Sequence, residues 1–148
     1  MKPKIMIISS GGGHLREAMI ALECFNKENL LFVCNSLPHL QNLDNINLVF
    51  IKNPHTNVLS YFRNLLQSIS IYNKYRPEII LTTGSGIAIS MFILGKMMGS
   101  KTIYIESGSR INYPSKTGRL LYRFSNHFII QSALLKPYFP KAILITGL

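Results

Sequence analysis

Three short segments of this sequence, rich in glycine and serine, could hold a phosphate group against the backbone. They cover residues 9–14, 82–86 and 106–110, and each directly follows an apolar run. Glycine allows the backbone to approach a ligand closely, and a helix that begins there offers free N–H groups to an anion. The alternative is that glycine serves only a tight turn between a strand and a helix. The residues expected to bind a phosphorylated ligand are Ser10, Gly11, Gly12, Gly13, Gly84, Ser85, Gly86, Ser107 and Arg110.

Two titratable residues in these segments, His14 and Glu106, are the candidates for catalysis. His14 could act as a general base for a hydroxyl or as a donor to a phosphate, although a lone histidine is more often structural. Glu106 is one of only six acidic residues in the chain. It could bind hydroxyl groups, orient His14, or pair with Arg110 and only fix the loop.

The charge balance of the chain favours an anionic partner. Sixteen Lys and Arg residues face six acids, which gives a net charge of +10. Such a surface suits phosphorylated ligands, anionic lipid headgroups or nucleic acid. Aromatic residues fall mainly in predicted strands and helices rather than in a basic-aromatic module, so nucleic acid is not expected. The basic stretch Arg110, Lys116, Arg119 and Arg123 could meet phosphates or form a solvated helix face.

Several familiar catalytic motifs are absent from the sequence. Arg16 and Ile89 occupy the third glycine positions of a dinucleotide fingerprint, and no GxxxxGK[ST] loop occurs. Asp44 is the only aspartate, so no DxD metal motif exists, and no GxSxG elbow is present. Cys24 and Cys34 form no zinc spacing and are expected in the core. We therefore expect neither a metal nor an organic cofactor.

Seven short apolar runs are predicted to be strands. Most of them lack alternation of polar and apolar residues, which is typical of strands covered on both faces in a parallel sheet. The runs are Lys4–Ile8, Leu30–Cys34, Leu48–Ile51, Glu78–Leu81, Thr102–Ile105, Phe128–Gln131 and Ala142–Thr146.

Helical spacing of apolar residues separates these runs. Helices are predicted over Leu15–Phe25, Leu59–Tyr72, Ile87–Met98 and Gly118–Ser125. Alternating strands and helices predict one α/β domain over residues 1–148, with a Rossmann-like, doubly wound and mostly parallel sheet. Ligands bind such sheets beyond the carboxyl ends of the strands, which is where the three glycine-rich segments fall.

No transmembrane helix is expected from the sequence, so any contact with a membrane would be peripheral. No signal peptide is visible, and the longest uncharged run, Ile79–Gly95, is broken by Thr82–Gly86. Two apolar helices are candidates for contact with lipid: residues 87–98 beside Lys96 and Lys101, and residues 58–72 with Arg63. The alternative for both helices is packing in the core.

Five motifs, taken in order and spacing, resemble those of one protein family. They are SGGGHL at residue 10, TTGSGIA at 82, YIESGSRI at 104, PSKTGRLLY at 114 and ITG at 145. They resemble the bacterial capsule and exopolysaccharide glycosyltransferase-enhancer subunits. They are also similar to the membrane-associated subunit of the eukaryotic two-protein transferase that adds the second GlcNAc to dolichol-linked oligosaccharide.

The resemblance implies the N-terminal, acceptor-side half of a GT-B glycosyltransferase that is split into two chains. The partner would bind the UDP-sugar, and this chain would be inactive without it. His14 and Glu106 would line the acceptor side of the cleft, with the first glycine segment facing the diphosphate of a polyprenyl-linked saccharide. The chain would lie on the inner face of the cytoplasmic membrane, and its last strand and Tyr138–Pro140 could meet the partner. The alternative is a stand-alone Rossmann-like domain for a nucleotide or another phosphorylated ligand, which the broken fingerprints disfavour.

Overall fold

The computed structural model of the protein describes residues 4–35, 47–54 and 58–146. Within these ranges the seven predicted strands are confirmed, each within a few residues of its expected position. They are β1 (Ile5–Ile8), β2 (Leu30–Cys34), β3 (Asn47–Phe50), β4 (Ile79–Thr82), β5 (Lys101–Ile105), β6 (His127–Ile130) and β7 (Ile143–Leu144). The last strand is shorter than predicted because Ala142 is held in a turn, where its N–H donates to Phe139 and its carbonyl accepts from the Lys136 ammonium.

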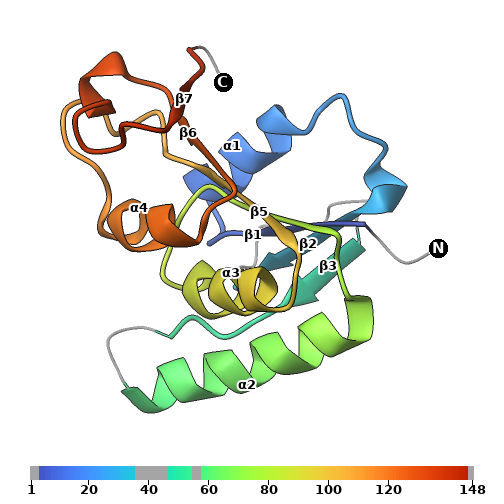
Figure 1. Ribbon diagram of the computed structural model, residues 1–148. Helices are drawn as coiled ribbons and strands as arrows, with labels where there is room; N and C mark the ends of the chain where they lie inside the picture. Colours follow the sequence, from blue (N-terminus) through green and yellow to red (C-terminus); the bar gives the residue numbers. More distant parts are fainter. Residues whose placement is uncertain (1–3, 36–46, 55–57, 147–148) are drawn as a thin grey trace.

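The strands form one parallel sheet in the order β3-β2-β1-β4-β5-β6-β7 (Figure 1). β1 pairs with β2 on one side and with β4 on the other, so that Ile5 lies opposite both Leu30 and Ile79. The strand order therefore reverses between β1 and β4. Such a switch point leaves a crevice at the carboxyl ends of the strands, because the two following connections leave on opposite faces of the sheet.

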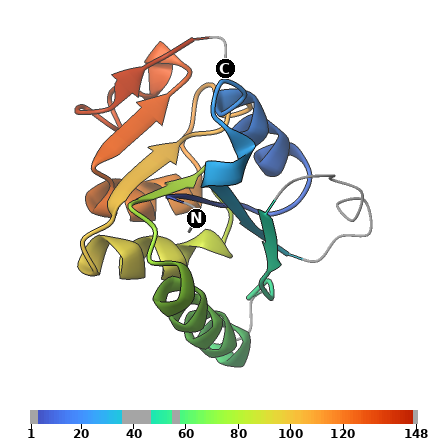
Figure 2. The same cartoon turned by 90° about the vertical axis from the view of Figure 1, so that its right-hand side faces the viewer.

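Helices cover both faces of the sheet, as expected for a doubly wound fold. α1 (Gly13–Ala21) lies on one face, and α2 (Val58–Tyr75), α3 (Ala88–Met97) and α4 (Lys116–Leu121) lie on the other (Figure 2). Ile7 packs with Leu15 and Ala18 beneath α1, whereas Met6 and Ile8 belong to the larger cluster on the opposite face. The strands are buried on both sides, which explains their nearly continuous apolar sequence.

The first helix is shorter than its apolar spacing predicts. α1 ends at Ala21, and Phe25, which was expected on its apolar face, is half exposed. The N–H groups of Leu22, Glu23 and Phe25 each donate to the carbonyl three residues earlier, which tightens the chain into turns. Short 3₁₀ turns follow at Lys27–Asn29, Tyr122–Phe124 and Ala133–Leu135.

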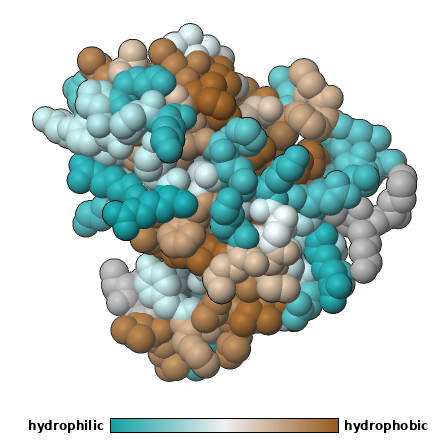
Figure 3. Space-filling model, viewed as in Figure 1, coloured by the Kyte–Doolittle hydropathy of each residue, from teal (hydrophilic) through white to brown (hydrophobic). Residues whose placement is uncertain are grey.

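α2 exposes most of its apolar side chains, unlike an ordinary amphipathic helix. Its buried residues are Asn64, Ser68 and Tyr72, and Ile71 and Tyr75 pack partly buried against the core, while its other apolar side chains are exposed. The Asn64 amide donates to the carbonyls of Lys52 and Ile87, and the Tyr72 hydroxyl bonds with Ser100 Oγ at 2.9 Å. The exposed apolar residues of α2 are Val58, Leu59, Tyr61, Phe62, Leu65, Leu66 and Ile69. Figure 3 shows the resulting hydrophobic surface along the lower edge of the molecule, where α2 lies.

The two candidate lipid-binding helices thus differ in their packing. α3 buries Ala88, Met91, Phe92 and Gly95, so the prediction that it belongs to the core is correct. For α2 the same expectation holds only in part, because Ile71, Tyr72 and Tyr75 pack in or against the core, whereas the apolar side chains nearer its start are exposed. No helix in the described part of the chain is both long enough and apolar enough to cross a bilayer. Cys34 is buried as expected and Cys24 is exposed, while Asp44 lies outside the described residues.

Candidate functional site

A cleft of about 450 Å³ lies where the carboxyl ends of β1, β4 and β5 meet. Its lining includes predicted site residues from all three glycine-rich segments, namely His14, Gly84, Ser85, Glu106, Ser107 and Arg110. The remaining lining residues are Ser109, Pro114, Ser115, Lys116 and Thr117. The other predicted residues, Ser10, Gly11, Gly12, Gly13 and Gly86, lie in the adjoining loops and not in the lining. The fold therefore brings the two catalytic candidates into one cleft.

The first glycine segment leads into α1 without a side chain that caps the helix. Gly12 is the residue before the helix, with φ of +88°, and no side chain accepts a hydrogen bond from the first turn. The N–H of Gly11 donates to Asn35 Oδ1 at 2.8 Å, so that group is already paired within the chain. The uncapped N–H groups at the start of α1 are the part of this segment that could still meet an anion.

The second segment holds the backbone in an unusual conformation next to His14. Ser85 has φ of +85°, a region that residues with a Cβ rarely adopt, and Gly84 has φ of +117°. A Cβ at Gly84 would lie 3.1 Å from the Tyr104 hydroxyl and 3.5 Å from His14 Cε1. Gly84 thus lets the imidazole and the tyrosine approach the same stretch of backbone. The Thr83 hydroxyl also donates to the His14 carbonyl at 2.7 Å, which ties this loop to α1.

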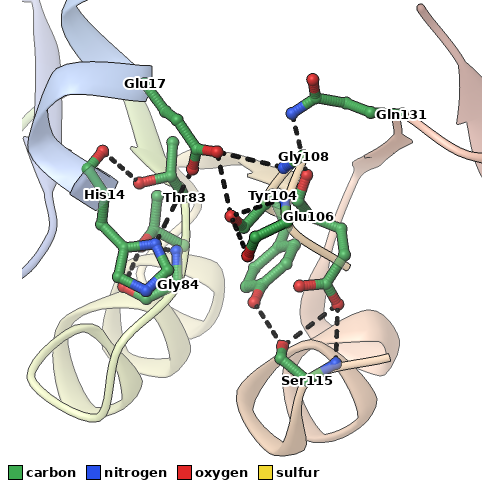
Figure 4. Close-up of polar contacts among 12 residues, drawn as sticks. His14, Glu17, Thr83, Gly84, Tyr104, Glu106, Gly108, Ser115 and Gln131 are labelled. Carbon is green, nitrogen blue, oxygen red and sulfur yellow. Dashed lines mark hydrogen bonds and ion pairs between the residues drawn. The ribbon is translucent and has the colours of Figure 1, made fainter. Parts of the chain in front are cut away.

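Glu106 binds Ser115, and not the partners expected from the sequence. Its Oε2 accepts from the Ser115 backbone N–H at 3.2 Å and from Ser115 Oγ at 3.1 Å (Figure 4). Among the described residues no ion pair joins Glu106 to Arg110 or to His14, so neither of these two alternatives is seen as a direct contact, although the charge of Arg110 lowers the pKa of the Glu106 carboxyl. Glu106 is 1% exposed, and this burial raises the pKa of its carboxyl, while the hydrogen bonds from Ser115 act in the opposite direction.

Ser115 links Glu106 to the start of α4. Its hydroxyl caps the helix by accepting the Gly118 N–H at 2.8 Å, and it also bonds with the Tyr104 hydroxyl at 3.2 Å. Gly118 lies against Glu106 so closely that a Cβ there would collide with Glu106 Oε2. Burial raises the pKa of Tyr104, so its hydroxyl stays protonated as a hydrogen-bond donor. The PSKTG segment therefore serves to hold Glu106 in place.

Glu17 is the functional candidate that sequence reasoning missed. Its Oε1 accepts from Ser107 Oγ at 2.9 Å and from the Gly108 N–H at 3.0 Å, and its Oε2 lies 3.8 Å from His14 Nδ1 (Figure 4). The spacing of three residues after His14 could have identified it, because residues at i and i+3 share one helix face.

The basic stretch divides between the cleft and the outer surface. Arg110 and Lys116 line the cleft, whereas the Arg119 guanidinium lies over the Tyr138 ring at 5.4 Å. Arg123 lies outside the lining. Two cations are thus placed to meet a negatively charged ligand. In the part of the chain that the structure describes, no three His, Cys, Asp or Glu side chains gather where they could hold a metal ion.

Comparison with known proteins identifies a family that this chain resembles in sequence. Residues 50–148 match the family described as "Oligosaccharide biosynthesis protein Alg14 like". The human UDP-N-acetylglucosamine transferase subunit ALG14 is 29% identical over 92 residues, which cover 58% of this chain and 43% of that protein. The corresponding subunit of Yarrowia lipolytica is 23% identical over 169 residues, covering 95% of this chain and 78% of that protein. The match to the human relative thus spans less than half of that protein's length.

Two solved structures share the fold with little sequence identity. MurG of Acinetobacter baumannii superposes with a TM-score of 0.76 at 14% identity, over 99% of this chain and 46% of that chain. The UDP-GlcNAc 2-epimerase of Methanocaldococcus jannaschii gives 0.70 at 13% identity, over 95% and 45%. Both neighbours have GT-B folds, which confirms the predicted Rossmann-like architecture. Because the family match covers more than half of the sequence, this chain belongs to the Alg14-like family of oligosaccharide biosynthesis proteins.

Proposed function

We propose that this protein is the acceptor-binding subunit of a two-component UDP-sugar glycosyltransferase. Its substrate is a polyprenyl-diphosphate-linked saccharide, and its pathway is the synthesis of a surface polysaccharide such as a capsule or exopolysaccharide. The observation that carries the proposal is the cleft at the ends of β1, β4 and β5, where His14 and Glu106 lie with Arg110 and Lys116. The relatives are named as UDP-N-acetylglucosamine transferase subunits, which supports the assignment to a subunit of a transferase.

The cations at the cleft suit the diphosphate of such an acceptor. Arg110 and Lys116 both line the cleft and are exposed, and neither forms an ion pair with a described acid. The uncapped start of α1 adds N–H groups beside the cleft. Arginine binds phosphate oxygens through two parallel hydrogen bonds, and lysine adds a point charge. We assign the diphosphate to this positive edge of the cleft.

The saccharide part of the acceptor then lies near His14 and Glu106. In the proposed reaction, His14 takes the proton of the attacking acceptor hydroxyl as its oxygen bonds to the anomeric carbon of the donor sugar. The bond from that carbon to UDP breaks, and UDP leaves with the bonding electron pair. Glu106, held by Ser115, binds an acceptor hydroxyl.

The donor sugar is supplied by a second subunit in this proposal. The human and Yarrowia lipolytica relatives are named as subunits of a UDP-N-acetylglucosamine transferase, which supports a division of the site between two proteins. We assign residues 1–148 to the acceptor half and expect this chain to be inactive alone. The exposed apolar residues Ile143, Leu144 and Ile145, together with Tyr138, lie at the β7 edge of the sheet. They form our candidate contact with the donor-binding subunit.

We place the protein on the inner face of the cytoplasmic membrane, with α2 as the contacting element. The exposed side of α2 carries aliphatic and aromatic residues, and the helix contains Arg63 and Lys74 but no acid. Apolar side chains flanked by cations suit the boundary between anionic headgroups and acyl chains. Contact there would hold the cleft close to a lipid-linked substrate.

Calorimetry with this chain alone tests the assignment of the acceptor site. We expect a polyprenyl-diphosphate-linked GlcNAc with a shortened lipid to bind, and UDP-GlcNAc to bind much more weakly. The double substitution of Arg110→Gln and Lys116→Gln should weaken acceptor binding by about 10-fold or more, because two charge-assisted phosphate contacts are lost. Lys101→Gln and Lys141→Gln together provide a matched loss of two exposed charges away from the cleft. Tight binding of UDP-GlcNAc without acceptor binding would favour a stand-alone nucleotide domain instead.

A further inference from the structure

The carboxylate of Glu17 joins α1 to the loop that follows β5. One of its oxygens, Oε1, accepts hydrogen bonds from Ser107 Oγ at 2.9 Å and from the Gly108 N–H at 3.0 Å. These donors lie 90 and 91 residues further along the chain. Both contacts require an acceptor atom at that position, which fixes the orientation of the whole carboxylate (Figure 4).

The second oxygen of Glu17 faces His14 and has no hydrogen-bond partner. Glu17 Oε2 and His14 Nδ1 are 3.8 Å apart, and both atoms are buried without any other hydrogen bond. Burying two unpaired polar atoms is unfavourable. A proton on Nδ1 would satisfy both atoms after a shift of roughly 1 Å, which brings them to ordinary hydrogen-bond distance.

Among the described groups around His14, Glu17 Oε2 is the one placed to bond with Nδ1. A Cβ at Gly84 would lie 3.5 Å from Cε1 and 3.8 Å from Nδ1, but Gly84 has no side chain that could bond with Nδ1, and the Thr83 hydroxyl donates to the backbone carbonyl of His14. The His14 side chain is 38% exposed although Nδ1 is buried, so the exposed part of the ring lies on another edge, and the residue lines the cleft. The other titratable or charged groups around the cleft, Tyr104, Glu106, Arg110 and Lys116, form no hydrogen bond with Nδ1.

We infer that Glu17 is a positioning residue that keeps His14 in the tautomer needed by a base. Its Oε2 accepts the Nδ1–H of His14, which leaves Nε2 without a proton and open to the acceptor hydroxyl. The same carboxylate secures the loop that carries Ser107. The inference rests on the proposed function, in which His14 receives the proton of the acceptor.

Glu17→Gln separates this role from a purely structural one. Ser107 Oγ–H and the Gly108 N–H both donate to the position of Oε1, so the glutamine carbonyl should occupy it. The amide NH₂ would then face His14 Nδ1 and donate to it, which moves the imidazole proton to Nε2. The hydrogen bonds from Ser107 and Gly108 to residue 17 are retained, while the imidazole proton moves from Nδ1 to Nε2. In serine proteases the equivalent exchange of acid for amide leaves the geometry intact and lowers kcat about 10⁴-fold.

The ¹⁵N chemical shifts of the His14 imidazole, recorded on this chain alone, test the inference directly. At about pH 8.5, above the usual titration range of histidine, we expect the Nδ1–H tautomer in the unmodified protein and the Nε2–H tautomer in Glu17→Gln. The spectrum of His14→Ala assigns the signals among the four histidines of the chain. Glu23→Gln, which removes an exposed carboxylate beyond the end of α1, should leave the tautomer unchanged. The same tautomer in Glu17→Gln as in the unmodified protein would overturn the inference.

Transfer assays with the donor-binding subunit present provide the second readout. Glu17→Gln should lower kcat by about 100-fold or more, as expected when a general base is blocked, with little change in the KM for the acceptor. A rise in acceptor KM at unchanged kcat would contradict the positioning role. The two hypotheses fail differently. If Glu17→Gln shows the Nε2–H tautomer but both Glu17→Gln and His14→Ala keep full activity, His14 is not the base. The contact between Glu17 and His14 would still be established by the tautomer.

Discussion

At the scale of single residues, Glu106 shows how this fold alters the chemistry of an acid. Burial raises the pKa of its carboxyl above the ordinary value of 4.5, against the hydrogen bonds from Ser115 and Ser107 and the charge of Arg110. As the pH rises from 4.5 through the raised pKa, the unfolded chain loses this proton before the folded protein does. The free energy of unfolding therefore decreases over that interval because of Glu106.

The substitution Glu106→Gln should remove this dependence on pH. We predict that unmodified protein loses stability relative to Glu106→Gln as the pH rises above 4.5, and that the difference becomes constant above the folded pKa. Urea unfolding at a series of pH values measures the difference. Glu28→Gln reports the effect of losing one exposed carboxylate. A difference that stays flat, or that changes in the opposite direction, would contradict the burial of an acid with a raised pKa.

At the scale of elements, strand positions could be predicted because glycines and helical spacing bound each apolar run. The parallel sheet followed from strands that are apolar on both faces, such as Leu30–Cys34, which is buried throughout. The buried side of α2 could not be predicted in this way. Apolar spacing shows that a helix is amphipathic, but it does not show whether the apolar side meets the core or a partner. In α2, Asn64 and Ser68 face inward instead.

For the candidate site, the proximity of the residues could be predicted from the sequence, but their hydrogen-bond partners could not. His14, Ser85 and Glu106 follow three strands whose carboxyl ends meet, so their proximity follows from the topology of the fold. Their hydrogen-bond partners do not follow from topology. Whether Glu106 meets Arg110 or Ser115 depends on the path of the loop before α4, and Glu17 reaches Ser107 across 90 residues of sequence.

The exposed apolar side of α2 leads to a prediction about membrane binding. We expect the double substitution of Phe62→Ser and Leu66→Ser to weaken binding to vesicles of phosphatidylglycerol and phosphatidylcholine by about 10-fold or more, because two apolar side chains no longer enter the lipid. Both residues are at least half exposed, so folding should be retained. Vesicle co-sedimentation measures binding, and circular dichroism checks the fold.

A matched control for this experiment lies on another element. Leu134 is 59% exposed on the 3₁₀ turn after β6. Leu134→Ser therefore removes an exposed apolar side chain of the same kind without changing α2, and it should leave vesicle binding intact. Equal weakening by Leu134→Ser, or unchanged binding after both α2 substitutions, would show that α2 is not the membrane contact.

At the scale of the whole molecule, the fold, the charge and the family relationship lead to one account. The sheet reverses its strand order beside β1, and the cleft there holds a base candidate, a buried acid and two cations. The chain carries a net charge of +10, which suits both a diphosphate acceptor and an anionic membrane surface. A second subunit that brings the UDP-sugar completes the proposed transferase.

Reconstitution of sugar transfer tests this central claim most directly. The assay follows GlcNAc from UDP-GlcNAc onto a polyprenyl-diphosphate-linked saccharide with this chain alone, with the proposed donor-binding subunit alone, and with both proteins together. We predict turnover only when both are present. Full activity from either protein by itself would contradict the account of a transferase divided between two chains.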